Sequence, residues 1–312
     1  MLKNQVGKMN IIILGGFLGS GKTTLLERLL KYNQEQNIKT CVLMNEYGKQ
    51  SVDTNIIDQA VPLKELLNGC ICCDLKVDVE IQIHQLYLEH QPECMIIECS
   101  GVAHPVEILD ACLSPVLTPF SNVQSLIGIV DATKIRDKAH FSPQISRLFI
   151  EQIKYCSYLL INKCDLLSDV EKEHVQKFVK EINPDAEMLL TQYCEINDIQ
   201  DVFKNSVSIN DQYDTGGVRQ HSGIQSYTYE FKNPVDSHLF VEWLKTLPKN
   251  IFRVKGFLSF KEQPETVFLF QYAYGVPEYR EILLKLPRYI VVIGEQLDKA
   301  SLATEFEAIE NT

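Results

Sequence analysis

A glycine-rich loop between an apolar run and a leucine-rich segment constrains this sequence more than any other feature. Residues 11–14 read IIIL, residues 16–23 read GFLGSGKT, and leucines follow at positions 25, 26, 29 and 30. Glycines let the backbone curl so that several N–H groups point at one phosphate, and a following helix N-terminus adds favourable potential. The pattern G-x-x-x-x-G-K-[ST] between a buried strand and a helix therefore predicts a phosphate-binding loop.

Two side chains of this loop have predicted chemical roles. Lys22 would neutralise the β- and γ-phosphates of a nucleotide, and the Thr23 hydroxyl would ligate Mg²⁺. The residues that we expect to bind the phosphates are Gly16, Gly19, Ser20, Gly21, Lys22, Thr23 and Thr24.

Strands and helices alternate through the first two thirds of the chain. Apolar runs predict strands at 11–14, 40–44, 94–97, 126–130, 158–161 and 186–190. Helical patterns cover 22–32, 77–90, 142–155 and 169–182. This alternation predicts an α/β fold with a mostly parallel sheet covered on both faces. We assign this first domain to residues 1–208.

The pattern changes near residue 209. Residues 209–223 are polar, contain glycine and lack periodicity, which indicates a linker. Beyond it, strands are predicted at 224–231, 253–260, 266–271 and 289–293, with helices at 235–247 and 295–310. We expect a small α+β domain over residues 224–312.

A second motif points to the base of the nucleotide. Asn162, Lys163 and Asp165 follow the apolar run at 158–161 in the pattern N-K-x-D. A carboxylate at the fourth position can accept hydrogen bonds from N1–H and the amine of guanine, whereas adenine offers no such pair of donors. Asn162 would support the other edge of the base, and Lys163 would lie along the nucleotide. The motif favours GTP over ATP.

Carboxylates end two of the predicted strands. Glu98 closes the run at 94–97, and Glu46 follows the run at 40–44. The carboxyl ends of parallel strands lie at the same edge of the sheet, and ligands bind at that edge. Glu98 is therefore a candidate to reach Mg²⁺ or to position the attacking water, and Gly101 offers an N–H near the γ-phosphate. We predict Lys22, Glu98 and Gly101 as the catalytic residues.

Three of the ten cysteines are crowded together. Cys70, Cys72 and Cys73 lie within four residues, and the other seven are scattered mostly through apolar segments, as small buried side chains are. Three thiolates suit Zn²⁺ and leave one tetrahedral position open for another ligand, as a metal carrier needs. Buried packing, a redox pair and a structural zinc site completed by a distant ligand such as Cys41 are the alternatives.

Composition excludes several classes of protein. The formal charge is −11 and the pI about 5.2, which argues against broad binding to nucleic acid or anionic membranes. No apolar run approaches the roughly 18 residues that span a membrane. The N-terminus lacks the pattern of a signal peptide, so a cytoplasmic location is expected.

These motifs together resemble the CobW-like GTPases, a family of metal-handling proteins. The resemblance rests on the phosphate loop, on Asn-Glu-Tyr-Gly at 45–48, on the C-x-C-C motif at 70–73, on E-x-x-G at 98–101 and on N-K-x-D at 162–165. RVKGF at 253–257 and VVIG at 291–294 resemble the C-terminal domain of that family.

The resemblance implies a P-loop GTPase domain joined to the C-terminal domain of the family. It also implies a metallochaperone that uses GTP and Mg²⁺, binds Zn²⁺ or Co²⁺, and delivers the metal to a client protein. Zinc would be held by Cys70, Cys72 and Cys73 with Glu46. Homodimers are common among related GTPases.

Two other functions compete with this one. A P-loop kinase would transfer phosphate to a small molecule, although the N-K-x-D and C-x-C-C motifs argue against it. A zinc sensor or buffer would use GTP only as a structural ligand, and its hydrolysis would be negligible and insensitive to metal.

Overall fold

A computed structural model of the protein describes residues 8–44, 63–65, 75–101, 105–136, 141–200, 202, 224–273, 276–282 and 287–311. The chain divides into two compact units, one made mainly of residues before 208 and one mainly of residues from 224 on. The predicted linker at 209–223 lies outside the described residues, so the domain boundaries stay a prediction.

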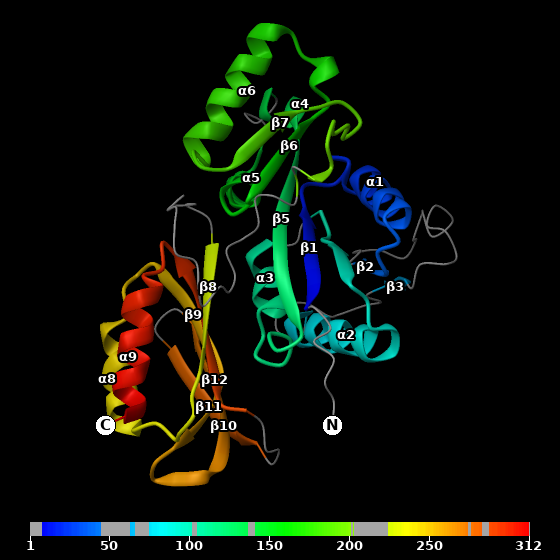
Figure 1. The fold of residues 1–312 in the computed structure, drawn as a ribbon. Helices are drawn as coiled ribbons and strands as arrows, with labels where there is room; N and C mark the ends of the chain where they lie inside the picture. Colours follow the sequence, from blue (N-terminus) through cyan, green and yellow to red (C-terminus); the bar gives the residue numbers. More distant parts are fainter. Residues whose placement is uncertain are drawn as a thin grey trace. The chain divides into compact units, whose positions relative to one another are not determined.

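The N-terminal unit is built on a parallel sheet, as the alternation of elements predicts. Its seven described strands have the order β3-β2-β4-β1-β5-β6-β7, and β1 lies in the middle (Figure 1). The strands are β1 (Met9–Gly15), β2 (Thr40–Met44), β3 (Leu63–Glu65), β4 (Cys94–Glu98), β5 (Ser121–Asp131), β6 (Tyr158–Asn162) and β7 (Glu187–Leu190). The helices are α1 (Lys22–Glu35), α2 (Leu75–His90), α3 (Pro105–Cys112), α4 (Ala132–Arg136), α5 (Pro143–Lys154) and α6 (Asp169–Ile182), with a 3-10 turn η2 (Cys164–Leu166).

One strand and two helices are absent from the sequence prediction, and β5 begins well before its predicted start. The strand β3 and the helices α3 and α4 are absent from it, because three to eight residues are too few to establish a period. β5 begins at Ser121, five residues before the apolar run, and a bulge opposite Ile11 and Ile12 lets its polar start pair with β1.

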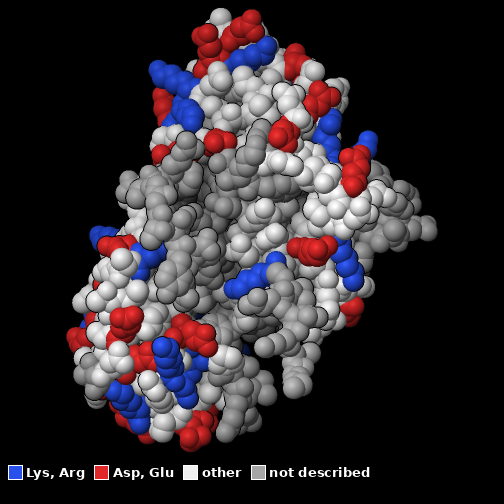
Figure 2. Space-filling model, in the orientation of Figure 1, with Lys and Arg blue, Asp and Glu red and all other residues white. Residues whose placement is uncertain are grey.

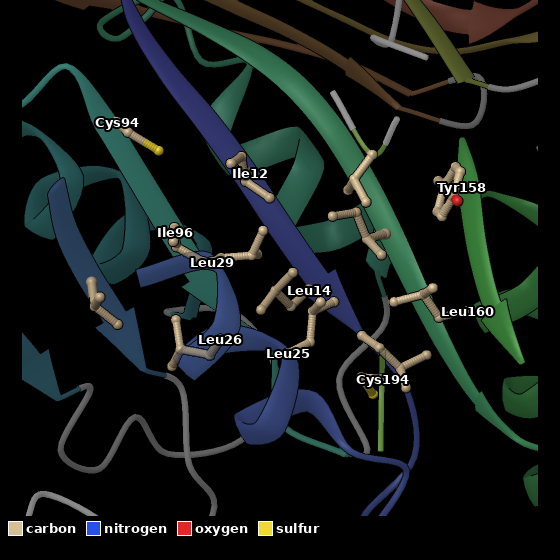
Figure 3. Close-up of a cluster of buried hydrophobic side chains, with 14 of the residues drawn as sticks. Ile12, Leu14, Leu25, Leu26, Leu29, Cys94, Ile96, Tyr158, Leu160 and Cys194 are labelled. Carbon is tan, nitrogen blue, oxygen red and sulfur yellow. The ribbon is translucent and has the colours of Figure 1, made fainter. Parts of the chain in front are cut away.

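The central strands are buried on both faces, as parallel strands between helices should be. All four residues from Ile11 to Leu14 are at most 1% exposed. On one face, Leu25, Leu26 and Leu29 of α1 pack against Ile12 and Leu14 (Figure 3). The apolar spacing of α1 therefore anchors the helix that follows the glycine-rich loop.

The register of the sheet brings particular strand ends together. Leu14 of β1 and Met44 of β2 both lie opposite Glu98 at the end of β4. On the other side of β1, the strand β5 ends at Asp131, which lies opposite Asn162 at the end of β6. The consecutive strands β4 and β5 lie on opposite sides of β1, and such a reversal of strand order creates the crevice where open α/β sheets bind ligands.

The C-terminal unit is an antiparallel sheet with two helices on one face. The sheet has the order β11-β10-β9-β12-β8, formed by β8 (Ile224–Glu230), β9 (Ile251–Phe260), β10 (Gln263–Ala273), β11 (Val276–Ile282) and β12 (Tyr289–Glu295). The helices α8 (Ser237–Thr246) and α9 (Lys299–Asn311) pack over a core that includes Phe240, Trp243 and Phe306. β11 is absent from the sequence prediction because nearly all of its residues are exposed and it lacks apolar alternation.

Charged side chains do not gather into a single basic patch on the face drawn in Figure 2. Lys and Arg are interspersed there with Asp and Glu over the described residues. Among the helices that the structure describes, none has the length and apolar character required to cross a membrane.

The seven scattered cysteines are all buried, which confirms their interpretation as small apolar side chains. Burial raises the pKa of Cys41 to about 11 and of Cys94, Cys99 and Cys194 to about 12. It also raises the pKa of Cys112, Cys156 and Cys164 above the ordinary value. The thiolate is the reactive form of cysteine, so these side chains should be inert in the folded protein.

We predict that a chromogenic disulfide reagent at pH 8 titrates no more than three thiols quickly in the metal-free native protein. The three are Cys70, Cys72 and Cys73, which lie outside the described residues, and all ten cysteines should react in denaturant. Rapid reaction of a fourth native thiol would contradict the burial of the other seven.

We also predict that Phe306→Ala lowers the free energy of unfolding of the C-terminal unit by about 3–5 kcal/mol, because a fully buried ring leaves a cavity. Trp243, the one tryptophan of the sequence, lies 4.8 Å from this ring and reports the transition by fluorescence in denaturant. The control Glu307→Ala removes an exposed side chain of the same helix and should change stability by about 0.5 kcal/mol or less.

Candidate functional site

The glycine-rich loop connects β1 to α1 and curls tightly, as predicted. Gly16 has φ +144° and Gly21 has φ +112°, values that side chains disfavour. A Cβ on Gly16 would lie 2.3 Å from the carbonyl oxygen of Ile129, and one on Gly21 would lie 2.5 Å from Asn162 Nδ2. Both positions therefore need glycine for conformation and for space.

The first turn of α1 lies open to an anion. Gly21 occupies the N-cap without a side-chain hydrogen bond, and the first turn carries no acidic residue. The first N–H groups of a helix have no partner within it, and its dipole favours negative charge there. Lys22 lies at this end, buried, and its Nζ donates to the carbonyl oxygens of Gly16 at 2.9 Å and Phe17 at 3.2 Å.

Two loop hydroxyls have different surroundings. Ser20 is fully buried, and its Oγ has no hydrogen-bond partner among the described residues. Thr23 Oγ1 instead donates to Glu98 Oε1 at 3.1 Å. Glu98 is only 5% exposed, so this hydrogen bond joins α1 to the end of β4 inside the site. Thr24, the next residue of α1, is half-buried.

Gly101 lies directly against the loop. A Cβ at this position would approach the backbone N of Leu18 to 2.6 Å and its Cα to 2.9 Å. The Gly101 carbonyl accepts a hydrogen bond from Gln152 Nε2 of α5 at 3.3 Å. The turn after Glu98 is therefore packed on the phosphate loop, and a side chain at residue 101 would displace one of them.

The residues of the N-K-x-D motif lie at the same edge of the sheet. Asn162 Nδ2 donates to the Ser20 carbonyl at 2.8 Å, and its Oδ1 accepts from the Cys194 N–H at 3.1 Å. Lys163 has φ +64° and forms a 2.6 Å ion pair with Asp131. Asn162 thus holds the phosphate loop, and its predicted contact with a base stays a prediction.

Asp165 lies exposed in the turn η2. A cavity of about 410 Å³ opens beside it, lined also by Lys172, Thr191 and Gln192. The carboxylate is thus available to a ligand at the same edge as the phosphate loop.

A loop that the sequence reasoning missed completes this part of the site. Tyr193 and Cys194, just after β7, both have positive φ, at +50° and +52°. Non-glycine residues rarely adopt this conformation, and it persists only where the surroundings enforce it. Arg28 Nε donates to the Tyr193 carbonyl at 3.0 Å, and Thr191 Oγ1 donates to the Glu195 carbonyl at 2.7 Å. The sequence offered one signal for this loop, namely its place directly after the last predicted strand of the parallel sheet, because ligands bind at the carboxyl ends of such strands.

The predicted zinc ligands Glu46, Cys70, Cys72 and Cys73 lie outside the described residues. Within the described ranges, no group of three or more His, Cys, Asp or Glu side chains is arranged to hold a metal ion.

Three named proteins are similar in sequence to most of the chain. It is 31% identical to the zinc chaperone YjiA of Escherichia coli over 84% of this chain and 85% of that one. It is 23% identical to the zinc chaperone CobW of Sinorhizobium over 97% and 98%. It is 24% identical to zinc-regulated GTPase metalloprotein activator 1 of Dictyostelium discoideum over 85% of this chain, and it spans 66% of the length of that protein.

One solved structure has a comparable fold along the whole chain. It is a zinc-bound triple mutant of the YjiA GTPase, 23% identical with a TM-score of 0.50, and the match covers 98% of this chain and all of that one. At this identity the likeness supports the fold alone.

Two family models match in sequence order. The nucleotide-binding domain of CobW/HypB/UreG matches residues 10–190, and the C-terminal domain of the cobalamin synthesis protein cobW matches residues 224–310. The first match covers more than half of the chain and contains the phosphate loop, Glu98, Gly101 and the N-K-x-D motif. The chain therefore belongs to the CobW/HypB/UreG family and carries its nucleotide-binding domain followed by the cobW C-terminal domain.

Proposed function

We propose that the protein is a GTP-dependent metallochaperone. It binds Zn²⁺, with Co²⁺ as the alternative, and couples slow hydrolysis of GTP to delivery of the metal to a client metalloprotein. The observation that carries the proposal is the hydrogen bond between Thr23 and Glu98. It joins the phosphate loop to β4, which is the neighbour of β2 in the sheet, and the cysteine motif lies between β2 and β4 in the chain.

The phosphate loop supports nucleotide binding. The open first turn of α1 and the buried Lys22 would face the β- and γ-phosphates.

The donor set at the loop fits Mg²⁺. Thr23 and Glu98 offer a hydroxyl and a carboxylate 3.1 Å apart, and hard oxygen ligands are those that Mg²⁺ prefers. When bound, Mg²⁺ would neutralise charge on the β- and γ-phosphate oxygens. Thr23 would contribute its hydroxyl oxygen, and Glu98 would act directly or through a water molecule.

Hydrolysis in this proposal uses three residues for positioning and charge. Water attacks the γ-phosphorus, the bond to the β–γ bridging oxygen breaks, and GDP and inorganic phosphate leave. Glu98 orients the water, Lys22 balances the negative charge, and the N–H of Gly101 lies near the γ-phosphate. The packing of Gly101 against Leu18 supports that last role, since it brings the turn after Glu98 onto the phosphate loop.

Guanine selectivity is assigned to Asp165. Its carboxylate is exposed in the turn after β6, the strand whose end carries Asn162, and a cavity opens beside it. Asn162 and the strained loop at Tyr193 and Cys194 would hold the pocket in shape, because Asn162 ties that loop to the phosphate loop. Lys163 would lie along the nucleotide, held by its ion pair with Asp131.

The metal cargo is assigned to Cys70, Cys72 and Cys73 with Glu46. The relatives named as zinc chaperones support zinc as the cargo. Chain order supports these residues as its ligands, because the motif falls between β2 and β4, which are hydrogen-bonded neighbours ending at Met44 and Glu98. A γ-phosphate that orders this edge would change the metal site, and the two affinities must then be coupled reciprocally.

The coupling predicts that the affinity for Zn²⁺ differs by about 5- to 150-fold between Mg²⁺ with a non-hydrolysable GTP analogue and Mg²⁺ with GDP. Competition with a chromophoric chelator measures both affinities. The double variant Cys72→Ala, Cys73→Ala should lose tight binding, whereas Cys94→Ala, which removes a core thiol far from the motif in sequence, should retain it.

Equal zinc affinities in the two nucleotide states would overturn the coupling. Hydrolysis that is negligible and insensitive to metal would identify a sensor or buffer, and transfer of the phosphate to an acceptor other than water would identify a kinase.

For the base site, we predict that Asp165→Asn lowers the preference for GTP over ATP by about 100-fold or more, because two hydrogen bonds to a charged acceptor are lost. Competitive displacement of a fluorescent GTP analogue measures the preference. The control Asp169→Asn removes a neighbouring exposed carboxylate that pairs with Lys172. Unchanged selectivity in Asp165→Asn would exclude this residue as the base contact.

A further inference from the structure

The C-terminal unit contains a large open groove that the proposed function does not use. Its volume is about 1000 Å³, at the upper end of ligand-binding pockets. It is lined by α8, the end of β9, β10 and the edge strand β11. All of these elements belong to the C-terminal unit, so the whole lining of the groove comes from that unit.

The floor of the groove is aromatic. Phe240 and Phe270 make an edge-to-face contact with ring centroids 4.9 Å apart, and Phe260 and Phe268 lie 5.4 Å apart. Phe268 also contacts Tyr279 of β11 at 6.1 Å. Contacts of this kind hold the rings in place, so the floor presents a fixed apolar surface.

Apolar side chains at the walls of the groove are exposed. Tyr279 of β11 is 70% exposed and Val241 of α8 is 47% exposed. The side chains of α8 and α9 cover a core formed with β8, β9, β12 and Phe270 of β10, whereas nearly all residues of β11 are exposed. A contiguous apolar surface with a polar rim is typical of a binding site for another protein.

The groove favours capture of side chains over addition of a strand. Pro277 of β11 has no N–H to offer to an added strand, and Glu278, Arg280 and Glu281 place charges along the same edge strand. Natural sheets use proline and charge in this way to prevent pairing at exposed edges. An amphipathic helix needs no such pairing, because its side chains fill an apolar groove directly.

The rim is acidic. The charged side chains that line the groove, apart from His238, are Glu242, Lys245, Glu262 and Glu281. Lys245 Nζ lies 2.7 Å from Glu242, which leaves the charges of Glu262 and Glu281 in excess. Glu262 accepts a hydrogen bond from Ser237 at 2.8 Å, which lowers its pKa and keeps it ionised.

We propose that this groove binds an amphipathic helix of a partner protein, with large apolar side chains on one face and lysine or arginine at its flanks. The apolar face would lie on the aromatic floor, and the basic flanks would lie against Glu262 and Glu281. The proposal stands independently of nucleotide and metal.

The test uses the full chain and synthetic 16-residue peptides without tryptophan. One peptide carries leucine at helical spacing with lysine elsewhere, a second replaces the lysines by glutamate, and a third alternates leucine and lysine as a strand does. Trp243 reports occupancy by its emission, because its ring lies 5.6 Å from that of Phe240 at the groove floor. Anisotropy of labelled peptide gives the dissociation constants.

The helical lysine peptide should bind in the micromolar range and about tenfold or more tightly than the other two. Tyr279→Ala and Val241→Asp should each weaken it about tenfold, as loss of an interface anchor does. The control Val170→Asp places the same charge at a valine of the N-terminal unit that is 77% exposed, and it should leave the dissociation constant of the peptide unchanged. The double variant Glu262→Lys, Glu281→Lys should reverse the preference toward the glutamate peptide.

Three results would overturn the proposal. Binding that survives both Tyr279→Ala and Val241→Asp would be attraction to the acidic protein as a whole. Equal or tighter binding of the alternating peptide would make the groove a strand acceptor. Failure of all peptides to bind, with unchanged circular dichroism and Trp243 emission confirming an intact fold, would exclude a helical partner.

Discussion

Burial of β1 on both faces, between β4 and β5, is the constraint on which the nucleotide-binding unit depends. Residues from Ile11 to Leu14 have almost no exposed surface, so the strand cannot shift without exposing apolar side chains. Because every described strand of this sheet is parallel, their carboxyl ends meet at one edge. This packing brings the glycine-rich loop, Glu98 and Asn162 to that edge.

Polar contacts then hold the edge in one arrangement. Asn162 ties the Ser20 carbonyl to the Cys194 N–H, and Thr23 ties α1 to Glu98. Gly101 packs so closely on Leu18 that a side chain at residue 101 would displace the turn after β4 or the phosphate loop. In the proposed function, these contacts are the route by which a change at the γ-phosphate would reach the ends of β2 and β4.

The C-terminal unit reaches stability by different means. Its antiparallel sheet buries one face under α8 and α9, and aromatic contacts around Phe306 dominate that core. Phe270 of β10 still packs on Phe240 of α8, but nearly all residues of β11 are exposed, and the groove lies between α8 and this edge strand. A polar and exposed strand such as β11 has no apolar period, so sequence patterns could not predict either the strand or the groove that it helps to form.

The sequence by itself determined the features that depend on local chemistry. The glycine spacing predicted the loop and the apolar runs predicted most strands, whereas the base site at Asn162, Lys163 and Asp165 stays a prediction. Tertiary structure alone decided which distant groups meet. The contact of Thr23 with Glu98 depends on strand register, and the positive φ of Tyr193 and Cys194 is enforced by Arg28 and Asn162. Such contacts join residues far apart in the chain, and their geometry is set by packing that no local pattern encodes.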